Sequence, residues 1–233
     1  MMSKMRMPMV PALDKDGWLF VGIFALIAIV LGMVSDFLGY IGWILTGWCA
    51  YFFRDPQRVT PVRDGLVIAP ADGVISAIVE DTPPEELGLE GGNWWRISTF
   101  LNVFDVHVNR VPIGGRILRS IYHPGKFLNA SLDKASKDNE RQSLVVETDF
   151  NNVQIGFVQI AGLVARRIRC DVSVEQHVKT GQRFGMIRFG SRVDIYLPKT
   201  YQPLVIVGQR MIAGETIIAD LTSQESQRLG ETR

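Results

Sequence analysis

The sequence predicts a mainly β fold, a barrel or sandwich-hybrid domain, preceded by an N-terminal apolar helical hairpin. Short β-rich runs separated by turns fill the chain from residue 66 onward, at a spacing typical of barrels and sandwiches rather than of alternating β-α units. Two uncharged stretches of helical length come before them. We therefore expect a membrane-associated region over residues 1–63 and a β-rich domain over residues 64–233.

Length and composition are those of one main domain with an appendage. The chain has 233 residues, a formal net charge of +1 and 47% hydrophobic residues. A near-neutral balance argues against a nucleic-acid-binding protein. Cys49 and Cys170 are far apart and predict no disulfide framework, so a reducing compartment is expected. With three histidines and no cysteine cluster, the sequence argues against a structural zinc site.

The hydrophobic excess is concentrated in two runs, residues 18–34 and 37–53. Each has about 17 residues and would be roughly 26 Å long as a helix, near the lower limit for crossing a hydrocarbon core of about 30 Å. Basic residues flank the pair on both sides: Lys4, Arg6, Arg54, Arg58 and Arg63. By the positive-inside bias both ends are cytoplasmic, so the hairpin spans the bilayer or dips into it. A signal peptide is disfavoured because no small-x-small cleavage site ends the first run. Two charge-free runs in succession also disfavour a buried hairpin of a soluble protein.

The expected strands follow the β-rich runs between turn residues. They cover residues 66–68, 74–79, 94–100, 103–111, 115–122, 144–148, 153–160, 164–170, 184–187 and 193–197. A helix is expected only over residues 129–137 and in the polar C-terminal tail.

The stretch from residue 161 to residue 198 contains two tight turns. Residues 179–182 form the first, between two expected strands, and residues 188–192 form the second. Gly190 in the second turn can take a positive φ that a residue with a Cβ would resist, and Ser191 follows it directly.

At these residues the sequence resembles phosphatidylserine decarboxylases, specifically their short bacterial (type A) branch. The shared motifs, in chain order, are Phe53-Arg54-Asp55-Pro56, Pro70-Ala71-Asp72-Gly73, Phe104-Asp105-Val106-His107-Val108-Asn109-Arg110, Tyr122-His123-Pro124-Gly125, Asn139-Glu140-Arg141, Gln159-Ile160-Ala161-Gly162 and Phe189-Gly190-Ser191. A Gly-Ser pair alone carries no weight. The ordered set, together with the apolar N-terminus, is highly specific.

The resemblance implies that the chain cuts itself between Gly190 and Ser191. The products are a large chain, 1–190, and a small chain, 191–233, which stay together as a heterodimer, with a higher oligomer left open. A serine hydroxyl at a strained turn can attack the preceding carbonyl, and elimination and hydrolysis then leave a covalent pyruvoyl group in place of Ser191. That pyruvoyl group is the expected cofactor, and no metal is expected.

The implied reaction is decarboxylation of phosphatidylserine to phosphatidylethanolamine and CO2 in phospholipid biosynthesis. The substrate amine forms a Schiff base with the pyruvoyl ketone, which takes up the electrons released with CO2. The expected partner is phosphatidylserine in the membrane, and the expected location is the cytoplasmic face of a bacterial cell membrane. A related serine phospholipid of the archaetidylserine type stays open as the substrate.

His107 is the candidate donor of a proton to the product carbanion. In an extended strand over residues 103–111, His107 shares a face with Asp105 and Asn109, while the alternate residues are apolar. Spacing alone leaves a site-lining strand and a solvent-exposed face equally open. The resemblance favours the catalytic role, and a histidine pKa near neutrality suits proton transfer.

Asp72 lies in a turn, where Asp is favoured for local hydrogen bonds alone. In longer-chain relatives an Asp of the matching motif, a His and the cleavage-site Ser form a charge-relay group, which carries over to Asp72. Those relatives have two histidines three residues apart, whereas here Arg110 follows His107. They also have Leu-Gly-Ser-Thr where this chain has Phe-Gly-Ser-Arg. Either His107 serves both self-cleavage and decarboxylation, or another base serves the first step.

Other polar residues of the motifs have weaker indications. Arg188 and Arg192 could pair with a lipid phosphate or carboxylate, or be solvated. His123 precedes Pro124 in a turn and could line the site, although a histidine in a turn is more often merely exposed. His177 lies between Glu175 and Lys179 near a hairpin, which gives little indication of function. Residues 139–141 either help to cover the pocket or form an ion cluster.

Three other classes of protein compete with this interpretation. A membrane-tethered metallopeptidase would need a spaced His/Asp ligand set, which the sequence lacks. A lipoyl- or biotinyl-like carrier would need an exposed lysine at a hairpin tip, for which Lys179 is a poor fit. A non-enzymatic membrane scaffold is the third. All three predict an intact chain.

Overall fold

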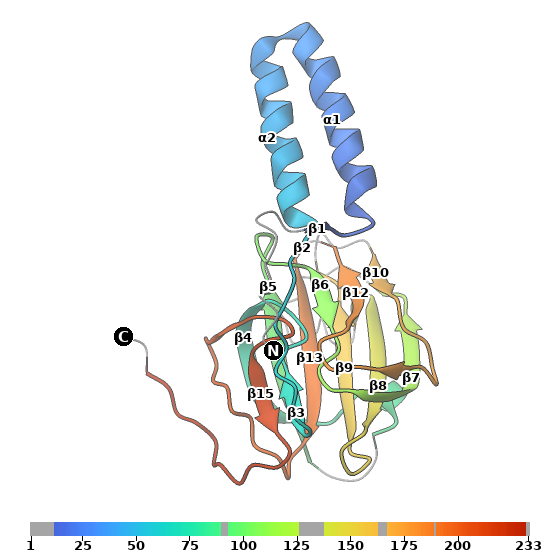
Figure 1. The fold of residues 1–233 in the computed structure, drawn as a ribbon, viewed down its shortest axis with the longest axis vertical. Helices are drawn as coiled ribbons and strands as arrows, with labels where there is room; N and C mark the ends of the chain where they lie inside the picture. The colour runs from blue at the N-terminus through green and yellow to red at the C-terminus, as the bar shows by residue number, and fades with distance from the viewer. Residues whose placement is uncertain (1–11, 90–92, 126–137, 163–166, 189, 232–233) are drawn as a thin grey trace, which may run out of the picture. The chain divides into compact units, whose positions relative to one another are not determined.

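The computed structural model describes residues 12–89, 93–125, 138–162, 167–188 and 190–231. The chain divides into two compact units, Met1–Gln57 and Arg58–Arg233. The first is helical and the second consists of strands, so the predicted mainly β fold with an N-terminal helical hairpin is confirmed (Figure 1). Both cysteines are free, as predicted.

The first unit is a hairpin of helices α1 (Gly17–Val34) and α2 (Asp36–Phe52), joined at Ser35 in extended conformation. Strands β1 (Ala12–Leu13) and β2 (Arg54–Asp55) pair antiparallel at its base. Small residues let the two helices approach closely. A Cβ added to Gly39, for example, would lie 2.9 Å from the Cα of Gly32.

The outer surface of this hairpin is apolar, because most of its large hydrophobic side chains are exposed. Among the described residues, α1 is a helix long and apolar enough to cross a membrane, with a mean hydropathy of 2.6. The length and composition of α1 indicate membrane association of the N-terminal region.

The second unit is built on an eight-stranded antiparallel sheet that curls over on itself (Figure 1). Its strands, in spatial order, are β11 (His177–Val178), β7 (Gly115–His123), β8 (Arg141–Thr148), β9 (Gln154–Ile160), β13 (Ser191–Pro198), β5 (Trp94–Leu101), β4 (Gly73–Asp81) and β14 (Arg210–Met211). A three-stranded sheet holds β10 (Ile168–Cys170), β12 (Arg183–Ile187) and β6 (Val108–Arg110). A pair holds β15 (Ile217–Asp220) and β3 (Leu66–Ile68), and a short 3-10 helix, η1, covers Glu85–Leu87.

Strand β13 lies between β9 and β5 and is buried on both faces. Ile195 and Leu197 point into the main core, since alternate residues of a strand share a face. Tyr196 on the other face packs in a second cluster with Leu87 and Trp94. The strand that begins with Ser191 is therefore among the most enclosed segments of the unit.

Two expected elements are wrong, and the short strands β1, β2, β11, β14 and β15 were not expected. The strand expected over residues 103–111 is wrong in its first half, because residues 102–106 form a turn and β6 begins at Val108. The Asn102 side chain accepts a hydrogen bond from the backbone N–H of Phe104 (2.8 Å), and such local bonds compete with strand pairing. The helix expected in the C-terminal tail is also wrong, since residues 222–231 form neither helix nor strand. The helix expected over residues 129–137 lies outside the described residues.

Candidate active site

Two connections join the same two sheets. One links β5 to β6 through residues 102–107, and the other follows β12 and leads to β13. β5 pairs with β13 so that Leu101 lies opposite Ser191, and β6 pairs with β12. At the small sheet, the backbone N–H of Ile187 donates to the carbonyl of His107 (3.4 Å). The topology therefore brings His107 and Ser191, which are far apart in sequence, to the same end of the β-rich unit.

Ser191 is the first residue of β13 and is fully buried, with 0% exposure. In the part of the chain that the structure describes, its Oγ has no hydrogen-bond partner. Gly190 before it has φ +56°, a conformation that side chains with a Cβ rarely adopt. A desolvated hydroxyl thus follows a peptide carbonyl in an unusual backbone turn, as a self-attacking serine requires.

His107 is also fully buried, with 0% exposure. Its Nδ1 lies 3.0 Å from the carbonyl oxygen of Asp105. A carbonyl can only accept a hydrogen bond, so Nδ1 carries the hydrogen and Nε2 of the neutral ring has the lone pair. The turn therefore fixes the orientation of the ring and leaves Nε2 as the nitrogen that can accept a proton.

Asp105 maintains that turn instead of acting on the ring. Its carboxylate accepts a hydrogen bond from the backbone N–H of Asn102 (2.9 Å) and pairs with the guanidinium of Arg210. Asp105 is 1% exposed, so both contacts compensate for a buried charge. Asp105 and His107 are both buried, but a turn that strand periodicity did not predict places them, and not a continuous strand.

Asp72 lies in a turn that reaches the same region. Ala71 belongs to a small apolar cluster, and a Cβ on Gly73 would collide with the carbonyl of Phe100. The Asp72 carboxylate accepts hydrogen bonds from Arg58 Nη2 (2.7 Å) and from the backbone N–H of Ala213 (2.8 Å). These contacts anchor the turn. A direct role of Asp72 in self-cleavage stays a prediction.

The small cluster provides the apolar surroundings of the site. It consists of Ala71, Leu101, Ala161, Ile168, Ile187 and Val193. These residues come from the ends of strands that meet around the start of β13. Apolar walls exclude water, which strengthens the electrostatic interactions of any charge formed there.

Comparison with known proteins identifies the family. A family model described as phosphatidylserine decarboxylase matches residues 45–219, which is most of the chain. The chain belongs to the phosphatidylserine decarboxylase family. Its members are carboxy-lyases, so the metallopeptidase, carrier and scaffold alternatives are removed.

Curated relatives agree along nearly the whole length. The chain is 57% identical over 221 residues to the phosphatidylserine decarboxylase proenzyme of Paramagnetospirillum magneticum, covering 95% of this chain and 92% of that protein. Identity to the proenzyme of Cereibacter sphaeroides is 55% over 221 residues, with 95% of each chain covered. Identity to the phosphatidylserine decarboxylase proenzyme of Ruegeria pomeroyi is 56% over 218 residues, covering 94% of this chain and 99% of that protein.

Arg192 does not fit either interpretation made from the sequence. It is 2% exposed, so it is not a solvated surface residue. Its guanidinium is paired with the carboxylate of Asp194, with Nε–Oδ1 and Nη2–Oδ2 distances of 2.9 Å. Arg192 therefore forms a buried ion pair on the face of β13 that also holds Tyr196, and it is not placed to bind a lipid phosphate.

Residues 139–141 tie strand ends together at this end of the sheet. Asn139 Nδ2 donates to the carbonyl of Ala161 (2.7 Å), and Glu140 Oε1 accepts from the backbone N–H of Ile168 (3.2 Å). Arg141 pairs with Glu86 of η1 (2.6 Å). The family motif Asn-Glu-Arg is thus a set of structural bonds around the site.

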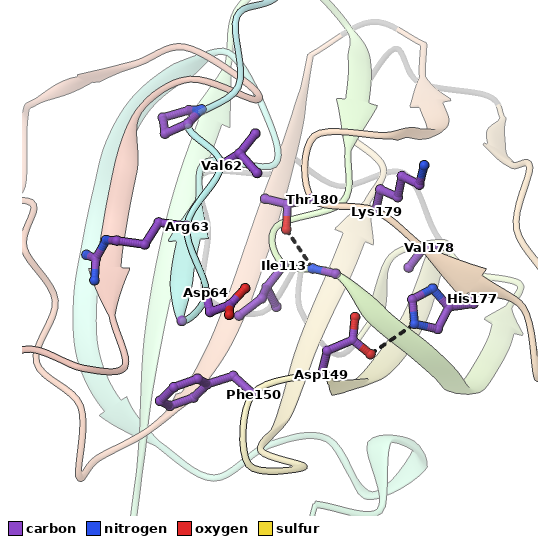
Figure 2. A pocket seen from close by; sticks show the side chains of 13 residues that line it. Val62, Arg63, Asp64, Ile113, Asp149, Phe150, His177, Val178, Lys179 and Thr180 are labelled. Atoms are coloured by element: carbon purple, nitrogen blue, oxygen red, sulfur yellow. Dashed lines mark hydrogen bonds and ion pairs between the residues drawn. The ribbon is translucent and has the colours of Figure 1, made fainter.

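An open cavity lies elsewhere (Figure 2). It has a volume of about 290 Å³ and is lined by residues that include Ile113, Asp149, Phe150 and His177. At one end of the sheet, Arg141 of β8 pairs with Ile160 of β9, which also pairs with Arg192, the neighbour of Ser191. At the other end, Thr148 of β8 pairs with Gly115 of β7, next to the residues that line the cavity. The cavity is therefore at the end of the large sheet opposite Ser191. At its rim, His177 Nε2 and Asp149 Oδ1 are 2.9 Å apart and both side chains are exposed.

The sequence did not predict that two polar residues near the site, Asn109 and Gln159, contact each other. Gln159 Nε2 donates to Asn109 Oδ1 across 2.8 Å, and both residues are fully buried. Each lies in a family motif, but their 50-residue separation gave no signal that they meet.

Proposed function

We propose that this chain is a pyruvoyl-dependent enzyme that converts phosphatidylserine to phosphatidylethanolamine and CO2 after cutting itself between Gly190 and Ser191. One observation carries the proposal: a fully buried Ser191 hydroxyl, with no hydrogen-bond partner among the described residues, directly follows a glycine with positive φ. The relatives' designation as proenzymes of phosphatidylserine decarboxylase supports both the processing and the substrate.

The proposed cleavage uses Ser191 and His107. His107 Nε2 takes the Ser191 hydroxyl proton, Oγ bonds to the carbonyl carbon of Gly190, and the carbonyl π electrons move to its oxygen. When this intermediate collapses, the C–N bond to Ser191 breaks, and the imidazolium returns its proton to the leaving nitrogen. Loss of the Ser191 α-proton then expels Gly190 as a carboxylate. The resulting enamine tautomerises to an imine, and water converts the imine to a ketone with release of ammonia.

The residues around Ser191 fit the resulting pyruvoyl group. It would stand at the N-terminus of β13, held by the pairing of that strand with β5 and β9 and surrounded by the apolar cluster. The group supplies an electrophilic ketone and an electron sink for loss of CO2. Buried His107 then holds, at Nε2, the proton that is delivered to the substrate carbon.

The small chain 191–233 remains bound to the large chain 1–190 in this proposal. It would contribute β13 to the middle of the large sheet, β14 to the edge beside β4, and β15 to the pair with β3. Ile195, Leu197 and Ile218 also belong to the main core. Separation of the chains would expose this apolar surface, so the heterodimer persists without denaturant.

The apolar hairpin supports a place at the cytoplasmic face of a bacterial cell membrane. Its exposed hydrophobic side chains need a non-aqueous surrounding, and its flanking basic residues favour the cytoplasmic side. Residues 1–63 would bring the enzyme to its lipid substrate, and residues 64–233 would carry the chemistry.

Intact-mass spectrometry of the purified, active protein under denaturing conditions tests the proposal. We expect two masses, for residues 1–190 and for residues 191–233 with a ketone in place of the serine amine. Reduction with borohydride should add two hydrogens to the small chain alone. A single full-length mass in a preparation that decarboxylates phosphatidylserine would overturn the proposal.

A further inference from the structure

The amides of Asn109 and Gln159 form an incomplete buried pair. Strand β6 supplies Asn109 and β9 supplies Gln159, so the bond between them joins the small sheet to the large one. Both residues have 0% exposure. Asn109 Nδ2 and Gln159 Oε1 have no hydrogen-bond partner among the residues that the structure describes. Whichever way round the two amides face each other, one NH2 group and one carbonyl are left over.

Such leftover groups destabilise a fold, because they lose water without gaining a partner. An apolar pair of similar size would fill the same space without this cost. A polar pair kept in such a place therefore indicates a bonding partner that forms at another stage of the protein's life.

The position of the pair points to the Gly190–Ser191 bond as the origin of that partner. Asn109 follows His107 by two residues, and Gln159 pairs with Val193, which follows Ser191 by two residues. Ser191 and Val193 share one face of β13. At Gly185, opposite Asn109 in β12, a Cβ would collide with the carbonyl oxygen of Arg169 (2.1 Å) and would also lie 3.2 Å from Gln159 Nε2.

We propose that the leftover N–H of the Asn109–Gln159 pair stabilises the oxyanion formed when Ser191 attacks the carbonyl of Gly190. In that step the Oγ–C bond forms and the carbonyl π electrons become a lone pair on the Gly190 oxygen, which accepts the amide hydrogen bond. Gln159 positions Asn109 by accepting or donating the shared bond. This inference rests on the proposed self-cleavage, and it assigns a donor to the step for which the sequence supplied only a base.

The test is the rate at which newly made chain is converted to two chains, followed by intact mass. Asn109→Asp keeps the shape and the bond from Gln159 but loses the NH2 donor. We expect cleavage to slow by about 100- to 1,000-fold, the usual effect of removing one oxyanion donor. Gln182→Leu removes an amide that accepts from the backbone of Lys179 at the far end of the small sheet, and should cleave at the parental rate.

A double variant, Asn109→Leu with Gln159→Leu, separates this role from a structural one. Since it removes the leftover polar groups, its melting temperature should equal or exceed that of uncut Ser191→Ala protein, while cleavage stays slow. Parental cleavage rates in both Asn109 variants would overturn the inference, as would a large fall in the melting temperature of the double variant. A parent chain that is never cut would instead overturn the proposed function.

Discussion

Two histidines near opposite ends of the large sheet, His107 and His177, are in opposite situations. His107, near Ser191, is fully buried with Nδ1 bonded to a backbone carbonyl. His177, at the far end, has a side chain that is 62% exposed and pairs with an equally exposed Asp149 beside a cavity. A cavity lies at the far end, where water solvates the charged groups and weakens their interactions. The near end encloses polar groups in an apolar cluster, where each proton and charge has a much larger effect. Burial of polar groups is therefore the feature that distinguishes the candidate site from the far end.

Substitution of Ser191 at the near end should cause the largest loss of cleavage and decarboxylase activity of all the variants. Ser191→Ala lacks the nucleophile, so we expect one uncut chain with no decarboxylase activity, measured by intact mass and by CO2 release. Ser191→Cys retains a nucleophile and should still be cut to some extent. Activity at the parental level in an uncut Ser191→Ala chain would show that Ser191 and its cleavage are not needed for the reaction.

Removal of the buried histidine, His107, should have the second-largest effect on activity. His107→Gln keeps a polar side chain but no base, so cleavage should slow by about 100- to 10,000-fold, the typical contribution of general acid–base catalysis. The fraction of two-chain product against time gives the cleavage rate, and CO2 release per cut molecule gives the later step. Normal rates in both assays would exclude His107 from the chemistry.

Glu86 should make a moderate contribution to the stability of the near end. Burial by itself raises the pKa of Glu86, but the hydrogen bond from Arg141 and the charges of Arg141 and His123 outweigh it, so the pKa lies below its ordinary value. A carboxyl with a lowered pKa stabilises the fold above its unfolded pKa of about 4.3, and this contribution is lost as the pH falls through the folded pKa.

Glu86→Gln should accordingly lower the free energy of unfolding by about 1 kcal/mol at pH 7, and by less near pH 3. Urea denaturation at the two pH values, in a Ser191→Ala background that keeps the chain uncut, measures the difference. An equal loss at both pH values would show that the Glu86 charge is not responsible.

The smallest effect is expected at the far end. His177→Ala removes an exposed ion pair with Asp149, which should change the free energy of unfolding by no more than about 0.5 kcal/mol. Cleavage and decarboxylation should keep their parental rates. A tenfold loss of either would show that the cavity takes part in function and would reverse the comparison of the two ends.

Short elements and sequence-distant contacts account for most of what sequence reasoning missed. Strands β14 and β15 have two and four residues, too few for a periodic pattern to develop. Asn102 and Asp105 replaced an expected strand by a turn, because short polar side chains bond to nearby backbone groups. The long runs with clear alternation, such as β5 and β13, were predicted closely.

The sequence by itself determined the mainly β class, the apolar hairpin, the family, and the candidates Gly190, Ser191 and His107. These follow from local composition, from periodicity and from ordered motifs, all of which can be read along the chain. Only the tertiary structure decided which nitrogen of His107 contacts the carbonyl of Asp105, that Arg192 is paired with Asp194, and that Asn109 meets Gln159. Each of these depends on which strands become neighbours and which side chains lose water, and the burial of distant segments against one another settles both.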